Sequence, residues 1–277
     1  MPVFAVVVFA AALHASWNAL VKTVADRRAL MAVMGAASMA ICLPGAFVVH
    51  APRSTAWAEI AASMVLHTVY NLLLIESYRD GDFNQVYPIA RGTAPPTVAV
   101  AAVLLVGESL APLQVAGLLG VSGGLLALAG GRRRGSKRAV AFALLTGLLI
   151  ASYTVVDGIG VRRAGSVPGY TTWLFTGNGL LTVLVLSATA RRSGRALRIP
   201  SGLITRGVVA GALSLAAYGL ILWAQTQAAL AVVAALRETS VVFAAILGAV
   251  VFHERMPSRR ILASVVIAAG AAALALG

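Results

Sequence analysis

The sequence predicts an all-α, polytopic membrane protein with ten transmembrane helices arranged as two inverted five-helix repeats. Three observations lead to this prediction. The composition is too apolar for a water-exposed surface, apolar runs of about 20 residues recur from end to end of the chain, and one pattern of polar residues occurs twice.

The composition excludes a soluble domain. Of the 277 residues, 60% are hydrophobic and 11% are charged, and the mean hydropathy is +0.90. Soluble globular proteins carry roughly 25% charged residues, so too few remain here to cover a surface in water. The apolar runs are continuous and rich in Ala, Leu, Val and Gly. They therefore indicate helices and not the alternating strands of a membrane barrel.

Ten spans divide into two halves at a basic segment, GRRRGSKR, residues 131–138. We expect 1–130 to be the first repeat, 131–138 a linker and 139–277 the second repeat. Because each half holds five spans, an odd number, the second half lies inverted relative to the first. The expected spans are 3–22, 29–49, 57–78, 84–106, 111–130, 139–159, 168–190, 206–226, 229–252 and 259–276.

The positive charges are distributed unevenly between the connections. Most of the 22 cationic residues lie in alternate connections, including the linker 131–138. Since cationic loops remain in the cytoplasm, this pattern predicts a cytoplasmic linker and both termini on the outside. The same sorting explains the formal net charge of +13 without nucleic acid, so we expect no nucleic-acid partner.

The internal repeat is clearest in the fourth and ninth spans. Arg91 and Glu108 mark the first copy, VYPIARGTAPPTVAVAAVLLVGES, and Arg237 and Glu254 mark the second, VAALRETSVVFAAILGAVVFHER. Each arginine is expected inside a span and each glutamate just beyond its end. A charge inside the bilayer is costly, so matched intramembrane arginines predict a functional site. Duplicated halves around such charges are typical of transporters.

Aromatic and polar residues form stripes on four other spans. On the first, His14, Trp17 and Asn18 share one helical face, and the third, sixth and eighth spans carry similar stripes. We expect them to line one wet cavity together with the intramembrane charges. The candidate substrate-binding residues are His14, Trp17, Asn18, His67, Tyr70, Asn71, Tyr87, Arg91, Tyr153, Asp157, Tyr218, Arg237 and Glu238.

A broken backbone is expected beside the first arginine. Pro88, Pro95 and Pro96 lie in the fourth span, and a proline within a helix frees a carbonyl group and kinks the axis. Many transporters build their sites from such breaks beside a buried charge. The ninth span has no proline but carries Glu238, which we interpret as either a proton-coupling acid or the counter-charge of Arg91.

Simpler interpretations exist for several of these residues. Arg91 and Arg237 would reach a membrane interface if their long side chains snorkelled. The aromatic residues would then be interfacial or packing residues, the histidines ordinary helix contacts, and Asp157 a marker of the interface. Glu108 and Glu254 are expected to cap helix ends or to contact loops.

The fifth and tenth spans, 111–130 and 259–276, are dominated by small residues. Small residues let helix backbones approach closely. We therefore expect these two spans to serve as scaffold or as the contact of a homodimer, and not to bind substrate.

No catalytic motif accompanies the polar residues. His253 and Glu254 resemble the start of a zinc-protease motif, but the second histidine that the motif needs is replaced by Pro257. The chain has neither a Gly-x-Ser-x-Gly elbow nor a phosphate-binding Gly-x-x-x-x-Gly-Lys-Ser/Thr loop. Cys42 is the single cysteine, so no disulfide forms within the chain. We expect no metal, no cofactor and no enzymatic activity, and transport that is secondary or facilitated.

The ten spans, the opening ALHASWNALVK and the Gly107-Glu108 and His253-Glu254 pairs that end the fourth and ninth spans carry a family resemblance. The chain resembles the drug/metabolite transporter superfamily, in its EamA-like branch. The resemblance implies two inverted repeats around a central cavity, alternating access, and transport of amino acids, nucleotide-type metabolites, sugars or drugs. It also implies termini on the inside, opposite to the loop charges, so orientation stays open. His253 departs from the family glycine.

Three functions compete at this point. The first is a secondary transporter, an exporter or exchanger in the cell (plasma or inner) membrane, whose substrate is a small polar metabolite with an anionic group. Two guanidinium groups near the midplane suit carboxylate, phosphate or phosphonate oxygens. The second is a membrane enzyme or lipid-handling protein that uses histidines and acids at the bilayer surface. The third is a scaffold without transport activity, in which buried arginines would have no purpose.

Overall fold

The computed structural model describes the chain except for residues 1, 81–82, 130–136, 193, 195–198 and 255, and within the described ranges every regular element is helical. The elements are α1 (Pro2–Lys22), α2 (Arg27–Gly45), η1 (Ser54–Ala56), α3 (Trp57–Asp80), α4 (Phe83–Ala101), the π-helical turn η2 (Ala102–Val106), α5 (Pro112–Ala129), α6 (Lys137–Ala164), α7 (Val167–Arg192), α8 (Ser201–Gln225), α9 (Leu230–Arg237), α10 (Ser240–Val250) and α11 (Ser258–Leu276).

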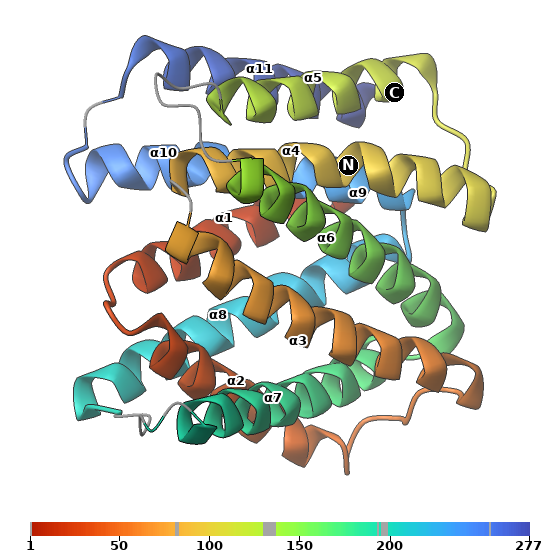
Figure 1. Cartoon of the computed structure of the whole chain (residues 1–277). Coiled ribbons are helices and arrows are strands. Elements are labelled where there is room, and N and C mark those ends of the chain that lie inside the picture. The colour runs from red at the N-terminus through yellow and green to blue at the C-terminus, as the bar shows by residue number, and fades with distance from the viewer. Residues whose placement is uncertain (1, 81–82, 130–136, 193, 195–198, 255) are drawn as a thin grey trace.

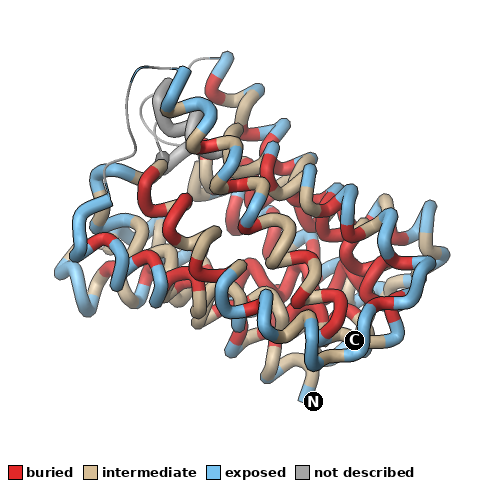
Figure 2. Tube along the Cα trace, turned by 90° about the horizontal axis from the view of Figure 1, so that it is seen from below, coloured by how far each residue is buried: buried red, intermediate tan, exposed pale blue. Residues whose placement is uncertain are grey.

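The expected membrane spans are present as helices. In the described part of the chain, nine helical segments are long and apolar enough to cross a membrane, with α9 and α10 forming one of them. The 24-residue α3 occupies the place of the remaining expected span. The outer surface stays apolar, since Leu104 and Leu105 are 75% and 71% exposed. Buried residues concentrate in the interior and exposed residues on the outer faces of the helices (Figure 2). The chain is therefore an all-α polytopic membrane protein.

Helices from the two halves pack in matching pairs. In Figure 1, α5 lies beside α11 at the top and α2 beside α7 at the bottom. Between them, α1 contacts α8 as α3 contacts α6, and α4 contacts α6 as α10 contacts α1. If each helix is replaced by its counterpart in the other half, the same pairs of neighbours result, as expected for two related repeats. The repeat boundaries stay a prediction, because most of the linker 131–138 lies outside the described residues.

The backbone break lies in the ninth span and not in the fourth. The helix α4 continues through Pro88, Pro95 and Pro96, so the expected interruption at these prolines was wrong. The ninth span instead divides at residues 238–239, between Arg237 at the end of α9 and Ser240 at the start of α10. Around this point the backbone hydrogen bonds connect residues three apart, which tightens the helix into a 3₁₀ turn.

The fourth and ninth spans end in the same backbone motif. Gly107 and His253 both adopt the left-handed conformation, with φ of 73° and 53°. The amide that follows each donates back to a carbonyl oxygen six residues earlier, that of Ala102 at 3.2 Å and that of Gly248 at 3.0 Å. In the Schellman motif, which ends helices, the corresponding bond also follows a left-handed residue but spans five residues, so both helix ends here are one residue wider. His253 therefore takes the same backbone role as the glycine.

Replacing His253 by glycine should stabilise the protein by roughly 0.5–1 kcal/mol. A left-handed conformation is strained in any residue with a Cβ, and His253 is exposed, so no packing is lost. Thermal unfolding in detergent measures the change, with Gly107→Ala as the mirror variant that should lower the melting temperature. A lower melting temperature for His253→Gly would contradict this account of the motif.

The small residues of α5 and α11 are used inside the molecule. A Cβ atom added to Gly117 would lie 2.6 Å from the Gly270 carbonyl oxygen, and one added to Gly270 would lie 2.7 Å from that of Gly117. The two backbones therefore approach too closely for any side chain at these positions. The close approach of the two helices is confirmed, and the scaffold role and the homodimer stay predictions.

Candidate functional site

A buried ion pair joins the two halves at the centre of the molecule. Nη1 of Arg91, on α4, lies 2.9 Å from Oε1 of Glu238, at the α9–α10 break, and the side chains are 5% and 0% exposed. Nη2 of Arg91 contacts Nε2 of His14 on α1, and its Nε donates to the Tyr87 hydroxyl at 3.3 Å. These contacts offset part of the free-energy cost of removing the two charges from water. The Arg91 side chain therefore does not snorkel, and Glu238 is its counter-charge.

The second arginine is buried without a hydrogen-bonded acid. Nε of Arg237 lies 3.8 Å from Oε1 of Glu238, beyond hydrogen-bond distance. Among the described residues this nitrogen has no hydrogen-bond partner, and the same holds for Oε2 of Glu238 and Oγ of Ser240. An unpaired buried polar atom costs roughly 1–3 kcal/mol. Three such atoms around one backbone break are what a binding site lacking its polar ligand would leave.

An aromatic cluster from three helices lies beside these charges. The ring of His67, on α3, stacks on Tyr153 of α6 at 4.1 Å between centroids, and it meets Tyr218 of α8 edge-on at 5.4 Å. Tyr70 lies 5.7 Å from Tyr153. Arg237 and Arg91 both interact electrostatically with Tyr153. The stripes of the third, sixth and eighth spans are therefore brought together as expected.

Asp157 is held by tyrosines in the interior. Its Oδ1 accepts a hydrogen bond from the Tyr170 hydroxyl at 2.9 Å and its Oδ2 accepts one from Tyr218. The Asp157 side chain is 0% exposed, so the interpretation of this residue as an interfacial marker was wrong. Sequence reasoning missed Tyr170, which lies in the first turn of α7. It also missed Ser63, which lies four residues before His67 and therefore on the same helical face.

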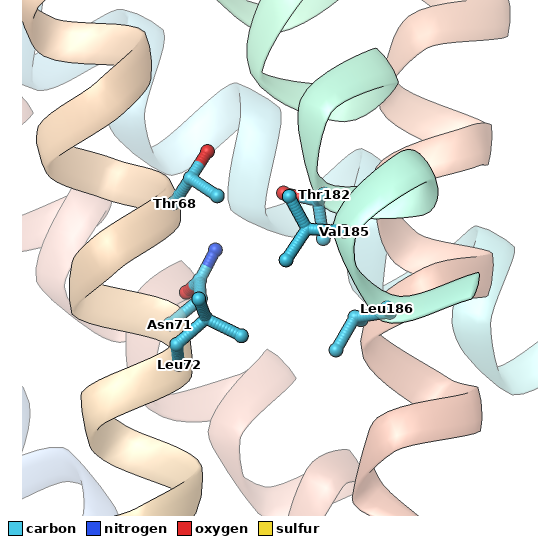
Figure 3. A pocket seen from close by; sticks show the side chains of 6 residues that line it. All are labelled: Thr68, Asn71, Leu72, Thr182, Val185 and Leu186. Atoms are coloured by element: carbon cyan, nitrogen blue, oxygen red, sulfur yellow. The ribbon is translucent and has the colours of Figure 1, made fainter. Parts of the chain in front are cut away.

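Three of the expected residues do not join the charged cluster directly. Asn18 donates to the His14 carbonyl oxygen of its own helix at 2.8 Å. Trp17 packs edge-on against the His14 ring at 4.9 Å. Asn71 faces α7, because the polar stripe of α3 extends over two neighbouring helices. Its amide lines a cavity of about 10 Å³ (Figure 3), room for about one water molecule, with Thr68, Leu72, Thr182, Val185 and Leu186.

The glutamates at the ends of the fourth and ninth spans tie the two halves together. Glu108 accepts a hydrogen bond from the amide of Leu230, the first residue of α9, at 2.8 Å and pairs with Arg162 at 2.9 Å. Glu254 pairs with Lys22 at the end of α1. The expectation that these residues cap helices or contact loops is confirmed. Each glutamate joins its span to the end of the first span of the other half.

The contribution of Glu254 to stability should vanish in acid. Lys22, and then Arg260, hydrogen-bond the ionised carboxylate and hold the pKa of Glu254 below its ordinary value. Such a group stabilises the fold fully above the ordinary glutamate pKa, about 4.3, and the stabilisation is lost as the pH falls through the lower folded value. Melting temperatures of the parent and Glu254→Gln should therefore differ at neutral pH, by less than about 1 kcal/mol, and converge in acid. A difference that grows with acidity would contradict this.

Metal-binding clusters are not found in the part of the chain that the structure describes, where no group of three or more His, Cys, Asp and Glu side chains is placed to hold an ion. The chemistry that remains is that of hydrogen bonds and charge. Two guanidinium groups, one carboxylate and a wall of tyrosine and histidine rings suit the recognition of a small polar molecule.

Comparison with known proteins identifies the family. The family model for "EamA-like transporter family" matches residues 137–276. A solved structure described as "Crystal structure of protein" aligns over 99% of this chain and 95% of its own, with a TM-score of 0.79 and 16% identity. At that identity the likeness shows a shared fold alone. No curated protein sequence matches the chain. Because the family model covers half of the chain, this protein belongs to the EamA-like transporter family of the drug/metabolite transporter superfamily, whose members are membrane transporters.

Proposed function

We propose that this protein is a secondary transporter that moves a small polar metabolite with an anionic group by alternating access, as an exporter or exchanger in the cell (plasma or inner) membrane. The observation that carries the proposal is the charge balance at the α9–α10 break. Arg91 and Arg237 bring two positive charges and Glu238 brings one negative charge, so these three residues together carry one net positive charge. A buried charge needs a partner, and an anionic ligand at Arg237 supplies it.

The unpaired polar atoms refine the substrate class. The Arg237 guanidinium donates hydrogen bonds, whereas Oε2 of Glu238 accepts one and neither has its full set of partners. A ligand that carries a carboxylate, phosphate or phosphonate together with a hydroxyl or amino group satisfies both. Tyr153, Tyr218 and His67 all interact electrostatically with Arg237. The substrate is therefore a compact metabolite with an acid group and a hydrogen-bond donor.

The ties between the halves support alternating access. The Glu108–Arg162 pair lies at the end of the fourth span and the Glu254–Lys22 pair at the end of the ninth. Five spans separate these ends, so the two pairs lie on opposite sides of the membrane. Each pair closes one side by joining the halves, and opening that side requires its pair to separate. Glu108 is 11% exposed and Glu254 is 32% exposed, so the two ties differ in access to water.

A ligand-stabilisation experiment tests this function. The purified protein is heated with glutamate, glycerol 3-phosphate, methylphosphonate or the cation tetraphenylphosphonium. A binder of the folded state contributes about 2.7 kcal/mol at 100 times its Kd. At least one anion should raise the melting temperature of the parent and of Arg206→Gln, an exposed control on α8, but not of Arg237→Gln. Stabilisation by the cation alone would contradict an anionic substrate.

A further inference from the structure

A second ionisable group lies beside the arginines, formed by His67 of α3 and Asp157 of α6. Nδ1 of His67 lies 3.0 Å from the Ser63 carbonyl oxygen and 3.0 Å from the Ser63 hydroxyl. A carbonyl oxygen only accepts, so Nδ1 carries a hydrogen and Nε2 is left to gain or lose a proton. Tyr218 contacts both residues, since its ring meets His67 edge-on at 5.4 Å and its hydroxyl donates to Oδ2 of Asp157, and the carboxylate and the imidazole interact electrostatically.

The two residues act as one protonation unit. Coupled groups share their protons, so the charge belongs to the pair and not to either member. With one exchangeable proton on Nε2 of His67, beside the ionised Asp157, the pair is neutral, and without it the pair carries one negative charge. The Tyr170 and Tyr218 hydroxyls hold the Asp157 oxygens in place for either form.

Charge balance couples this proton to the substrate. The cluster of Arg91, Arg237 and Glu238 holds one net positive charge, and His14 is counted as neutral because its Nε2 accepts from Arg91. The whole centre is then neutral in two states. One state holds a monoanion and the proton, and the other holds neither. Every other combination leaves a net charge in the bilayer core, which is costly.

We propose that His67 and Asp157 form the proton-binding site of this transporter, and that one proton crosses together with each monoanionic substrate. The proposal rests on the proposed function for its coupling partner. Nε2 of His67 takes its proton from water on one side of the membrane and returns it to water on the other, with no bond to substrate formed. The counterparts of these residues in the other repeat are Leu215 and Val21, so the site occurs once per molecule.

The neighbours of the pair come from every helix packed against it. The titratable and charged groups that interact with the pair are Tyr153 of α6, Tyr170 of α7, Tyr218 of α8 and Arg237 at the end of α9. Tyr70, Arg91 and Glu238 interact in turn with Tyr153. The tyrosine hydroxyls stay neutral near pH 7, and Arg91 and Glu238 neutralise one another. An anionic substrate compensates the charge of Arg237. Arg237 therefore connects the substrate site with the proton site.

Nitrogen-15 NMR of histidine-labelled protein in lipid nanodiscs tests the proposal without any substrate. The His67 signals, assigned by their loss in His67→Gln, should change from neutral to charged imidazole between about pH 4.5 and 9. Asp157→Asn should weaken proton binding at His67 at least tenfold, since it removes the negative member of the pair. Arg206→Gln, an exposed substitution on α8 far from the pair in its contacts, should change it by less than threefold.

Two results would overturn the proposal. One is a His67 ring that stays in a single protonation state throughout this range in the parent protein, a measurement that needs no folded variant. The other is a proton affinity in Asp157→Asn within twofold of the parent. Both are independent of the ligand-stabilisation experiment, so the absence of an anionic ligand and the absence of a proton site give different outcomes.

Discussion

Replacing Glu238 by glutamine should destabilise the protein by about 3–5 kcal/mol. The variant removes the only carboxylate within 4.0 Å of Arg91 among the described residues and leaves a guanidinium buried at 4% exposure. Removing one member of a buried pair is more damaging than removing both, because the remaining charge keeps its desolvation penalty. Denaturant unfolding in detergent measures the loss.

The double variant Glu238→Gln, Arg91→Gln distinguishes this from a general packing defect. It should recover more than half of the lost stability, because no charge remains unpaired, and the deviation from additivity measures the pair. Glu254→Gln is the matched control, since Glu254 is 32% exposed and its removal should change stability by less than about 1 kcal/mol. A Glu238→Gln variant as stable as the parent would show that Glu238 is not the counter-charge of Arg91.

Replacing Arg237 by glutamine should leave the fold intact and reduce transport at least 100-fold. Nε of Arg237 has no hydrogen-bond partner among the described residues, so its removal takes away little stability. Truncating a charged group that pairs with a buried ligand costs about 2–5 kcal/mol of binding, and 100-fold corresponds to about 2.7 kcal/mol. Arg237→Lys keeps the charge but lacks the planar guanidinium group. Its transport rate should therefore lie between those of the parent and Arg237→Gln.

Exchange in proteoliposomes measures this effect, with the anion that stabilises the parent most in the ligand experiment. Folding is checked in the same samples by the melting temperature. The two variants thus distinguish the roles of the two residues, since Glu238→Gln should lose stability whereas Arg237→Gln should lose transport. Unchanged exchange by Arg237→Gln, or a loss of folded protein as large as in Glu238→Gln, would contradict the assignment of Arg237 to the substrate.

The architecture was predictable because it depends on properties that the sequence displays locally. Apolar length determines the spans, and the repeated arginine and glutamate positions show the duplication. Local geometry favoured Arg91 over Arg237 as the partner of Glu238, because neighbouring helical residues point about 100° apart, but it left the role of Glu238 open between a proton-coupling acid and a counter-charge. In the structure Glu238 pairs with Arg91 at 2.9 Å and still lies 3.8 Å from Arg237. The matching helix ends at Gly107 and His253 were visible as a pattern, although the strain accepted at His253 was not.

Other features depend on tertiary contacts that no local pattern records. The ninth span breaks at Glu238 without a proline, because the tightened turn is held by contacts with α4 and not by the local sequence. The helix α4 stays continuous although its prolines lack backbone N–H donors, because neighbouring helices pack against it and support it. Tyr170 reaches Asp157 from another helix, and Asn71 faces α7 although its spacing from His67 suggested the central site.

The most direct test of the account is the reactivity of a cysteine at the α9–α10 break. Ser240→Cys, made in a Cys42→Ser background, exchanges one buried atom beside Arg237 and keeps every charge. Ser122→Cys on α5 is the control, because Ser122 is equally buried and its hydroxyl also has no partner among the described residues. If the break is a substrate site that opens to water, Ser240→Cys reacts with a small charged methanethiosulfonate, more slowly when the stabilising anion is present, while Ser122→Cys stays unmodified. A Ser240→Cys variant as inert as Ser122→Cys would contradict a central transport site at the break.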